Sequence, residues 1–395
     1  MDNGTLSDSQ PFNSKGENPS FLDDFKKAYG EDFSTAIDIE TWRIGENLAV
    51  LYPLIEKELL QAKQDEVKTH RAFREIIFPK IKELGTVPHA GLHDDIKSDE
   101  IIEKVHKGFL FNGSVTACGS VSSVYNSVPI SITQIGICLV NYQGQHGSYS
   151  HRLFRRDLRY KGDDPVKEAM DLIERRRSDD EANDERERLS DIAIRGIKTY
   201  AERSILIEKS NSRWLLGSGT PVPNELMRGF WSSRREMKEK SITLMRKMIL
   251  EHKHFVYVQD CVRNPQLWTF GNALKPFEYL VVDTIKDGLE KRLATGGMRG
   301  EFLADYNKMV ADVGDEVAMG LYRVSKHSPP QIFYCHIDHI QVAALIAMAD
   351  SVLQMHLGSP MLLDLASNIC KAAFGQSDFI ASIEQAYAKA EVLIR

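Results

Sequence analysis

Carboxylate and imidazole side chains stand at the ends of several short apolar segments of this chain. Asp260 and Asp283 each follow such a segment, and His336, Asp338 and His339 follow another. Carboxylates at strand ends often hold Mg²⁺ or Mn²⁺ in phosphodiester chemistry, although they also begin ordinary turns. In a strand, His336 and Asp338 would share one face, so they could begin a metal site or form a hydrogen-bonded structural pair. The sequence indicates no third ligand beside them.

The motifs of several enzyme classes are absent. The sequence contains no GxxxxGK[ST] phosphate loop, no GxGxxG after a strand, no HExxH and no GxSxG. It therefore has no motor of the P-loop type, and the common dinucleotide, zinc-protease and serine-hydrolase patterns are missing. The five cysteines are far apart and form no CxxC pair. That spacing argues against a disulfide framework and against a structural zinc site.

Charge limits how the chain could bind nucleic acid. Its 395 residues include 50 basic and 56 acidic side chains, for a formal net charge of −6. A protein that coats duplex DNA is normally basic, so any contact with DNA must come from a local patch or from a partner. Two basic stretches, 152–161 and 228–253, could pair with phosphates, with solvated surface as the alternative. The candidate contact residues are Arg152, Arg155, Arg156, Arg234 and Arg235.

The order of the predicted elements favours an α/β fold with one mixed sheet flanked by helices. Apolar residues three and four positions apart predict a long helical region within 37–84, and residues 109–117 and 128–142 are β-rich. Further strands are expected at 214–216, 255–259, 279–283, 317–324 and 331–335, and helices at 224–252, 340–357, 361–374 and 377–394.

We expect three regions along the chain. Residues 1–20 are polar and should form a disordered tail, 21–104 a helical region, and 105–395 the main domain with a charged helical insert at 163–209. The start lacks the apolar core of a signal peptide, and no apolar run reaches the ~20 residues that a membrane span needs. These features predict a cytoplasmic protein.

Three blocks in order resemble the NurA family of DNA-end nucleases. The blocks are residues 115–120 with 129–136, residues 214–223, and residues 358–367. The family has a strand ending in Asp-Gly-Ser, a second ending in Asp-Gly-Ser or Asp-Gly-Thr before a proline, and Gly-Tyr-Pro followed by Ala-His. The resemblance implies an RNase H-like sheet, a nuclease centre that binds Mn²⁺ or Mg²⁺, a homodimer, and a HerA-type hexameric ATPase as partner.

The chain departs from the family where the chemistry resides. The family's two aspartates fall at Cys118 and Ser218, its tyrosine at Ser359 and its histidine at Ser367. Neutral hydroxyls and a thiol are poor ligands for hard cations, so these changes should cripple metal binding. The family also uses a glutamate on the helix before the second strand. The nearest acidic residues there are Glu202 and Asp191.

The scaffold residues beside those positions are kept. They are Gly119, Gly219, Gly358 and Pro360, and we expect Gly119 and Gly219 to take positive φ in tight turns. The pattern predicts a pseudonuclease that needs no cofactor and works on DNA beside the ATPase. The alternatives are an active Mn²⁺- or Mg²⁺-dependent nuclease with relocated ligands (Asp260, Asp283, His336 and Asp338), or an unrelated α/β binding protein.

Overall fold

The computed structural model divides the chain into two compact units, 1–67 and 68–395. The described residues are 19–42, 48–94, 99–126, 130–144, 146–156, 166–167, 170, 180–227, 235–261, 265–295 and 300–390. The expected tail lies outside these ranges up to residue 18. Among the residues just given, no helix is both long and apolar enough to cross a membrane.

The described part of the first unit consists of helices. Its elements are α1 (Pro19–Tyr29), α2 (Phe33–Ile37), the 3-10 turn η1 (Ile39–Thr41) and most of α3 (Leu48–Ala72). The Phe25 ring contacts Tyr29 within α1 and Phe33 at the start of α2, with ring centroids 4.7 and 5.2 Å away. Pro53 lies inside α3 and does not end it.

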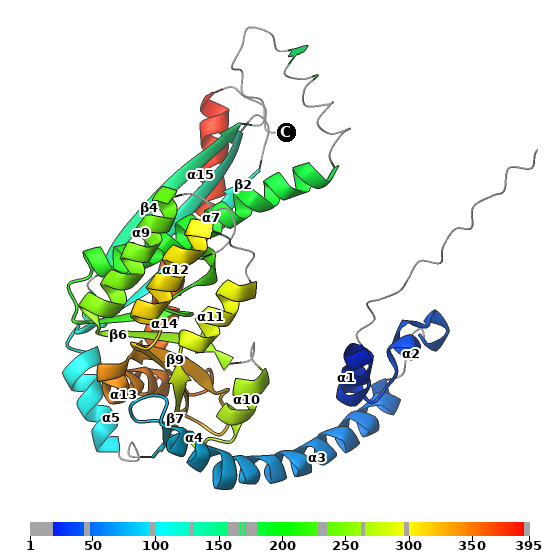
Figure 1. Ribbon diagram of the computed structural model, residues 1–395. Helices are drawn as coiled ribbons and strands as arrows, with labels where there is room; N and C mark the ends of the chain where they lie inside the picture. The colour runs from blue at the N-terminus through cyan, green and yellow to red at the C-terminus, as the bar shows by residue number, and fades with distance from the viewer. Residues whose placement is uncertain are drawn as a thin grey trace, which may run out of the picture. The chain divides into compact units, whose positions relative to one another are not determined.

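The second unit contains one sheet of nine strands (Figure 1). The strands are β1 (Gly91–His93), β2 (Val115–Tyr125), β3 (Ile130–Val140), β4 (His146–Arg156), β5 (Trp214–Ser218), β6 (Phe255–Asp260), β7 (Glu278–Thr284), β8 (Val317–Arg323) and β9 (Gln331–His336). Their order across the sheet is β1-β7-β8-β9-β6-β5-β2-β3-β4. Strands β2, β3 and β4 form an antiparallel meander, whereas β2, β5 and β6 are parallel neighbours. A meander whose first strand pairs in parallel with β5, which in turn pairs in parallel with β6, is the RNase H-like arrangement expected from the sequence.

Helices cover both faces of this sheet (Figure 1). They are the π-helical turn η2 (Phe73–Ile77), α4 (Phe78–Leu84), α5 (Asp99–Val105), the π-helical turn η3 (His106–Leu110), α7 (Asp180–Lys209), η4 (Asn224–Leu226), α9 (Arg235–Arg246), the π-helical turn η5 (Lys247–His252), α10 (Pro265–Asn272), α11 (Lys286–Thr295), α12 (Gly300–Val313), η7 (Ile337–His339), α13 (Ile340–Val352), α14 (Met361–Phe374) and α15 (Gln376–Lys389). Side chains of a strand alternate between faces, so Leu215 belongs to the core cluster that includes residues of α7, α9, α11 and α12, and Leu216 to the one that includes residues of α5, α13 and α14.

Two local predictions from the sequence differ from the structure in their boundaries. The β-rich segment predicted at 109–117 is divided, because η3 extends to Leu110 and β2 begins only at Val115. The helix predicted at 224–252 is present as the continuous α9 and η5, but its first residues form the separate 3-10 turn η4, and residues 228–234 lie outside the described part of the chain. Propensity alone did not locate these boundaries, since packing of each segment against the sheet sets them.

Gly119 lies within β2 and does not form a turn, which corrects the expectation of positive φ. It pairs with Cys138 of β3, and the strand continues past it to Tyr125. A Cβ at Gly119 would lie 2.3 Å from the carbonyl oxygen of Ala366 in α14. Glycine is needed here because the helix backbone lies directly on the strand. Gly219, in contrast, has the expected positive φ of 85°.

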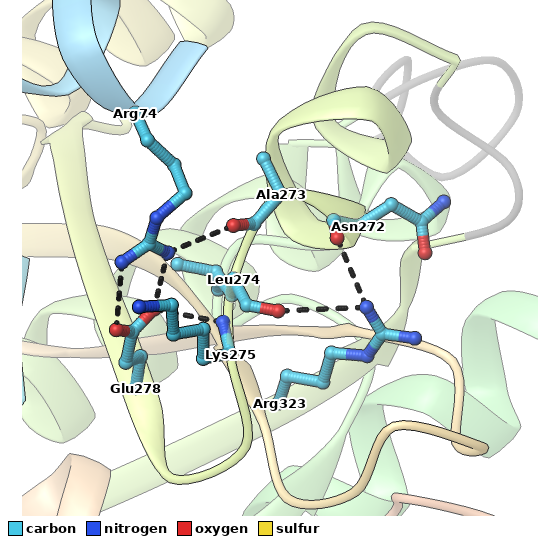
Figure 2. Close-up of polar contacts among 7 residues, drawn as sticks. All are labelled: Arg74, Asn272, Ala273, Leu274, Lys275, Glu278 and Arg323. Carbon is cyan, nitrogen blue, oxygen red and sulfur yellow. Dashed lines mark hydrogen bonds and ion pairs between the residues drawn. The ribbon is translucent and has the colours of Figure 1, made fainter. Parts of the chain in front are cut away.

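A buried ion pair attaches η2 to the start of β7. Figure 2 shows the Arg74 guanidinium donating to both carboxylate oxygens of Glu278, at 2.6 and 2.9 Å, and to the carbonyl oxygen of Ala273 at 2.9 Å. Glu278 is 2% exposed and also accepts from the Lys275 amide at 2.7 Å. In the neighbouring strand, Arg323 donates to the Asn272 carbonyl at 2.9 Å. Both charges of the pair thus have hydrogen-bond partners, which the buried carboxylate of Glu278 requires.

Asp350 joins α13 to the first turn of α14. This fully buried carboxylate accepts hydrogen bonds from the Leu362 amide at 2.9 Å and the Tyr142 hydroxyl at 2.5 Å. Burial raises the pKa of Asp350 to about 6, against the opposing effect of these two hydrogen bonds. The position of α14 therefore depends both on the glycine contact with β2 and on this carboxylate.

Replacing Gly119 with alanine should destabilise the protein by about 3 kcal/mol, because the new Cβ overlaps helix backbone that cannot rotate away. Chemical denaturation measures the change in the free energy of unfolding. Gly288→Ala in the exposed part of α11 is the matched control, since a Cβ there meets nothing within 4 Å. The control should be stabilised by about 0.5 kcal/mol. Equal stability of Gly119→Ala and the wild type would contradict the close packing.

Asp350→Asn should remove a pH dependence of stability. The pKa of Asp350 is raised from 3.8 to about 6 in the folded state, so the native state holds its proton more tightly than the unfolded state does. The resulting stability is present below pH 4 and is lost as the pH rises through about 6, a change of up to about 3 kcal/mol. The difference in unfolding free energy between Asp350→Asn and wild type should therefore grow with pH.

Denaturation curves between pH 4 and pH 7.5 measure this difference. Glu384→Gln, at an exposed position of α15, removes one carboxylate elsewhere and should give a curve parallel to that of the wild type. A parallel curve for Asp350→Asn would show that the buried carboxylate does not hold a proton.

Candidate functional site

A polar cleft of about 680 Å³ opens where β5 and β6 end and α7 and α14 pass over β2. Its lining residues are Cys118, Gly119, Ser120, Lys198, Thr199, Glu202, Arg203, Ser218, Gly219, Thr220, Pro223, Asn224, Glu225, Gln259, Asp260, Arg292, Leu363, Asp364 and Ser367. This set includes residues from all three sequence blocks that resemble NurA. The blocks are separated by up to 250 positions along the chain, so only the fold brings them together.

Strand pairing explains why the blocks meet. In the parallel pair of β2 and β5, Ala117 lies beside Leu216, and in the next pair Ser218 lies beside Val258. Parallel strands present their carboxyl ends at the same edge of a sheet, which is where open α/β sheets form their clefts. The close contact of α14 with Gly119 then brings Ser367 to the same edge.

At four positions where the NurA family has an aspartate, tyrosine or histidine, this chain has a different residue. Three of these four residues line the cleft. They are Cys118, Ser218 and Ser367. The fourth, Ser359, lies beside the cleft and does not line it. Its carbonyl and hydroxyl oxygens accept from the Gln354 amide nitrogen at 3.0 and 3.3 Å, and the same nitrogen donates to Asp364 at 2.6 Å. Ser359 therefore shares the Gln354 amide with Asp364 in the first turn of α14.

The Cys118 side chain is a neutral thiol. It is 3% exposed, and its Sγ lies 3.6 Å from the Glu202 carbonyl oxygen, to which it donates. Burial raises the pKa of this thiol well above its ordinary value, and the nearby Glu202 and Cys370 raise it further, whereas Arg203 lowers it. A metal ligand must be a thiolate. Cys118 consequently does not replace the charge of an aspartate.

The acidic side chains of the cleft are dispersed. Glu202 accepts from the Ser120 hydroxyl at 2.8 Å, and Asp364 is held by Gln354, while Asp260 is exposed at the end of β6. Within the described ranges, no three His, Cys, Asp or Glu side chains are grouped so that they could hold a metal ion. The neutral thiol and neutral serines at the family positions offer no anionic ligand for Mn²⁺ or Mg²⁺. The other acidic candidate, Asp191, has its side chain outside the described part.

The residue that the sequence did not reveal is Arg203. Its guanidinium is 4% exposed, donates to the carbonyl oxygens of Thr220 at 2.7 Å and Thr199 at 3.3 Å, and lies 5.2 Å from the centre of the Tyr257 ring. The one available signal was its spacing of three residues from Leu206, which places both on the buried face of α7. In a segment so rich in charge, that spacing is easily overlooked.

The alternative metal ligands do not form one centre. Asp260 lines the cleft, but Asp283 lies three strands away across the sheet, which corresponds to about 14 Å. Asp283 instead borders a separate cavity of about 150 Å³. Asp260 pairs with Gln331 at the start of β9. His336 lies at the other end of the same strand, about 16 Å from Gln331.

His336 lies in a buried, hydrogen-bonded position at the end of β9. Its side chain is fully buried, its Nδ1 accepts from the Asp338 amide at 3.1 Å, and its Nε2 lies 3.3 Å from a Glu316 oxygen. Burial, followed by the charge of Lys253, lowers the pKa of His336 to about 4. Lys253 itself pairs with Asp338 at 3.1 Å, and His339 stacks on a neighbouring histidine ring rather than facing His336 as a ligand.

The candidate DNA-contact arginines lie away from the cleft where they are described. Arg152 donates to Gln134 at 2.9 Å and borders an apolar groove of about 610 Å³ between β3, β4 and α15. Arg235 is exposed and pairs with Glu239 at 2.9 Å. Arg155 and Arg156 belong to β4, but their side chains, like Arg234, lie outside the described residues. A role of these residues in DNA binding stays a prediction.

Comparison with known proteins gives similarity in structure alone. No family model matches the sequence, and no curated protein matches it. The NurA nuclease from Sulfolobus solfataricus is 10% identical, with 85% of this chain and 97% of that chain covered and a TM-score of 0.41. A structure of NurA with manganese is 9% identical, with 73% and 95% covered and a TM-score of 0.41. Endonuclease V from Ciona intestinalis, in complex with a 24mer DNA, is 10% identical, with 69% and 92% covered and a TM-score of 0.24. These similarities assign no residue of the chain a role.

Proposed function

We propose that this chain is a NurA-like component of a DNA-processing complex that has lost metal-dependent cleavage and acts as a scaffold or DNA guide. The observation that carries the proposal is the convergence of Cys118, Ser218 and Ser367 on one cleft. Three blocks identified from sequence resemblance would have no reason to meet at one edge of the sheet if that resemblance were accidental.

The chemistry of the cleft supports the loss of cleavage. At the two family positions for aspartate, Cys118 is a buried neutral thiol and Ser218 is a neutral hydroxyl. Two negative charges that would neutralise a divalent cation and position its water are therefore missing. The backbone requirements are kept, because Gly119 still admits α14 and Gly219 still takes positive φ.

The proposed partner is a HerA-type hexameric ATPase, bound by a homodimer of this chain in the cytoplasm. The sequence has no phosphate-binding loop, so a motor would have to act in trans. Its net charge of −6 agrees with a complex in which the ATPase ring makes most of the contacts with DNA. Such a complex would serve DNA-end processing or defence against phage.

One observation favours a second candidate, the active nuclease with relocated ligands. Glu202, Asp260 and Asp364 all line the cleft in which the family's centre would lie. A relocated centre would therefore draw on these three carboxylates, and not on His336 or Asp338 at the far end of β9.

The purified chain should not degrade linear DNA in Mn²⁺ or Mg²⁺, either alone or with a HerA-type ATPase, and it should co-purify with that ATPase. Gel analysis of end-labelled DNA and size-exclusion chromatography measure the two outcomes. Metal-dependent cleavage that Asp260→Ala abolishes, but that Asp283→Ala leaves intact, would establish the second candidate. Failure to bind the ATPase of the same genome would remove the proposed partner.

Restoring the family's carboxylates with Cys118→Asp and Ser218→Asp should create a response to Mn²⁺. Without metal, the buried charge should destabilise the double variant by about 3 kcal/mol. Mn²⁺ at 100 times its Kd should restore about 2.7 kcal/mol, because it binds only the folded state. Thermal unfolding in EDTA and in Mn²⁺ measures the effect.

The matched control is Cys118→Asn with Ser218→Asn, which has the same shape without the charge and should not respond to Mn²⁺. A restored chain that ignores Mn²⁺ would show that the cleft does not descend from a metal centre. A wild-type chain with an equal Mn²⁺ response would show that the centre was never lost.

A further inference from the structure

We propose that Arg203 and Lys198 form a metal-independent binding site for one phosphate group of a DNA strand. This inference rests on the proposed function, because it assigns the ligand chemistry of the same cleft. Both side chains come from α7 and line the cleft with Ser218 and Gly219. The guanidinium would supply the positive charge that a metal ion supplies in a nuclease of this fold.

The first argument is that Arg203 is a buried charge without an anionic partner. All of its hydrogen bonds go to neutral carbonyl oxygens, of Thr199 and Thr220, and its Nε is buried without any partner in the described part of the protein. A buried cation is costly when no anion compensates it. The Tyr257 ring under the guanidinium offsets only part of that cost. An arriving phosphate would offset the remainder.

The second argument is position. Arg203 is near enough to Cys118 to lower the pKa of its thiol against the larger effect of burial. The guanidinium is therefore beside the family position of an aspartate. A positive charge there would repel a metal cation bound at that position. Loss of the carboxylates and presence of the guanidinium act in the same direction, because both change the cleft from binding a cation to binding an anion.

The third argument concerns the mouth of the cleft. Lys198 is half-buried, lines the cleft and has no hydrogen-bond or ion-pair partner in the described ranges. An ammonium group on a flexible side chain binds phosphate oxygens readily, whereas the rigid guanidinium fixes their direction. The two groups together offer one fixed and one adjustable donor.

The acidic residues of the cleft set the size of the site. Glu202 is held by Ser120 and Asp364 by Gln354, so neither carboxylate forms an ion pair with Arg203. Asp260 and Glu225 are exposed on the rim. Their negative charges repel a continuous phosphate backbone, so the cleft should accept a single phosphate and should not hold an extended strand.

The test is fluorescence anisotropy of a short fluorescein-labelled single-stranded DNA in EDTA. Wild type should bind in the absence of metal, and inorganic phosphate should compete. Lys198→Gln removes one charge-assisted hydrogen bond at a partly exposed position and should weaken binding about tenfold. Arg203→Lys keeps the charge but loses the fixed fork, and it should also weaken binding. Thermal unfolding of each variant checks that it is folded.

The matched control is Lys209→Gln, which removes the same charge from an exposed end of the same helix. It should bind DNA within about twofold of wild type. Absence of binding in EDTA, binding that only Mn²⁺ restores, or equal effects of Lys198→Gln and Lys209→Gln would each overturn the site. DNA cleavage by the wild type would refute the pseudonuclease but leave a metal-independent phosphate site standing, so the two failures are distinguishable.

Discussion

The close contact between α14 and β2 at Gly119 is the constraint on which the candidate site depends. The helix backbone occupies the space that a side chain at position 119 would need. A Cβ there would lie 2.3 Å from the Ala366 carbonyl oxygen. Because of this contact, α14 crosses the strand that carries Cys118 and brings Ser367 and Asp364 to the cleft. A similar approach at Gly136, where a Cβ would lie 2.3 Å from the Phe374 ring, continues the contact onto β3. The candidate site thus depends on close packing between α14 and the glycine positions of β2 and β3.

The character of the cleft follows from the charges of the side chains that line it. A neutral thiol at Cys118 and a hydroxyl at Ser218 leave no anionic pair, and the buried Arg203 adds a fixed positive charge nearby. In a partly enclosed site, where charges are poorly screened, such a change of sign decides which ligands are stable. Under the proposed phosphate site, the buried Arg203 would bind an anion in the cleft where the sequence resemblance implies a metal ion. Fold and function separate at a small number of side chains.

The remainder of the second unit secures the sheet on which this cleft is built. Arg74 and Glu278 attach η2 to β7, and Asp350 attaches α14 to α13 through the Leu362 amide. At the other end of β9, the buried His336 is held neutral and bonded to the Asp338 amide. Arg74, Glu278, Asp350 and the Nδ1 atom of His336 all have hydrogen-bond partners. Their roles are structural, and titratable side chains alone did not reveal the site.

The sequence by itself determined the fold class, most strands of the sheet, and which three blocks belong together. Apolar periodicity and glycine positions are local properties, so they can be read from neighbouring residues, and Gly219 with its positive φ is an example. Only the tertiary structure decided that Asp260 and His336 lie at opposite ends of the neighbouring strands β6 and β9. It also decided that Gly119 allows α14 to pack closely on β2, and that Arg203 is buried in the cleft. Burial and charge environment depend on residues far away in the chain, and no local pattern contains that information.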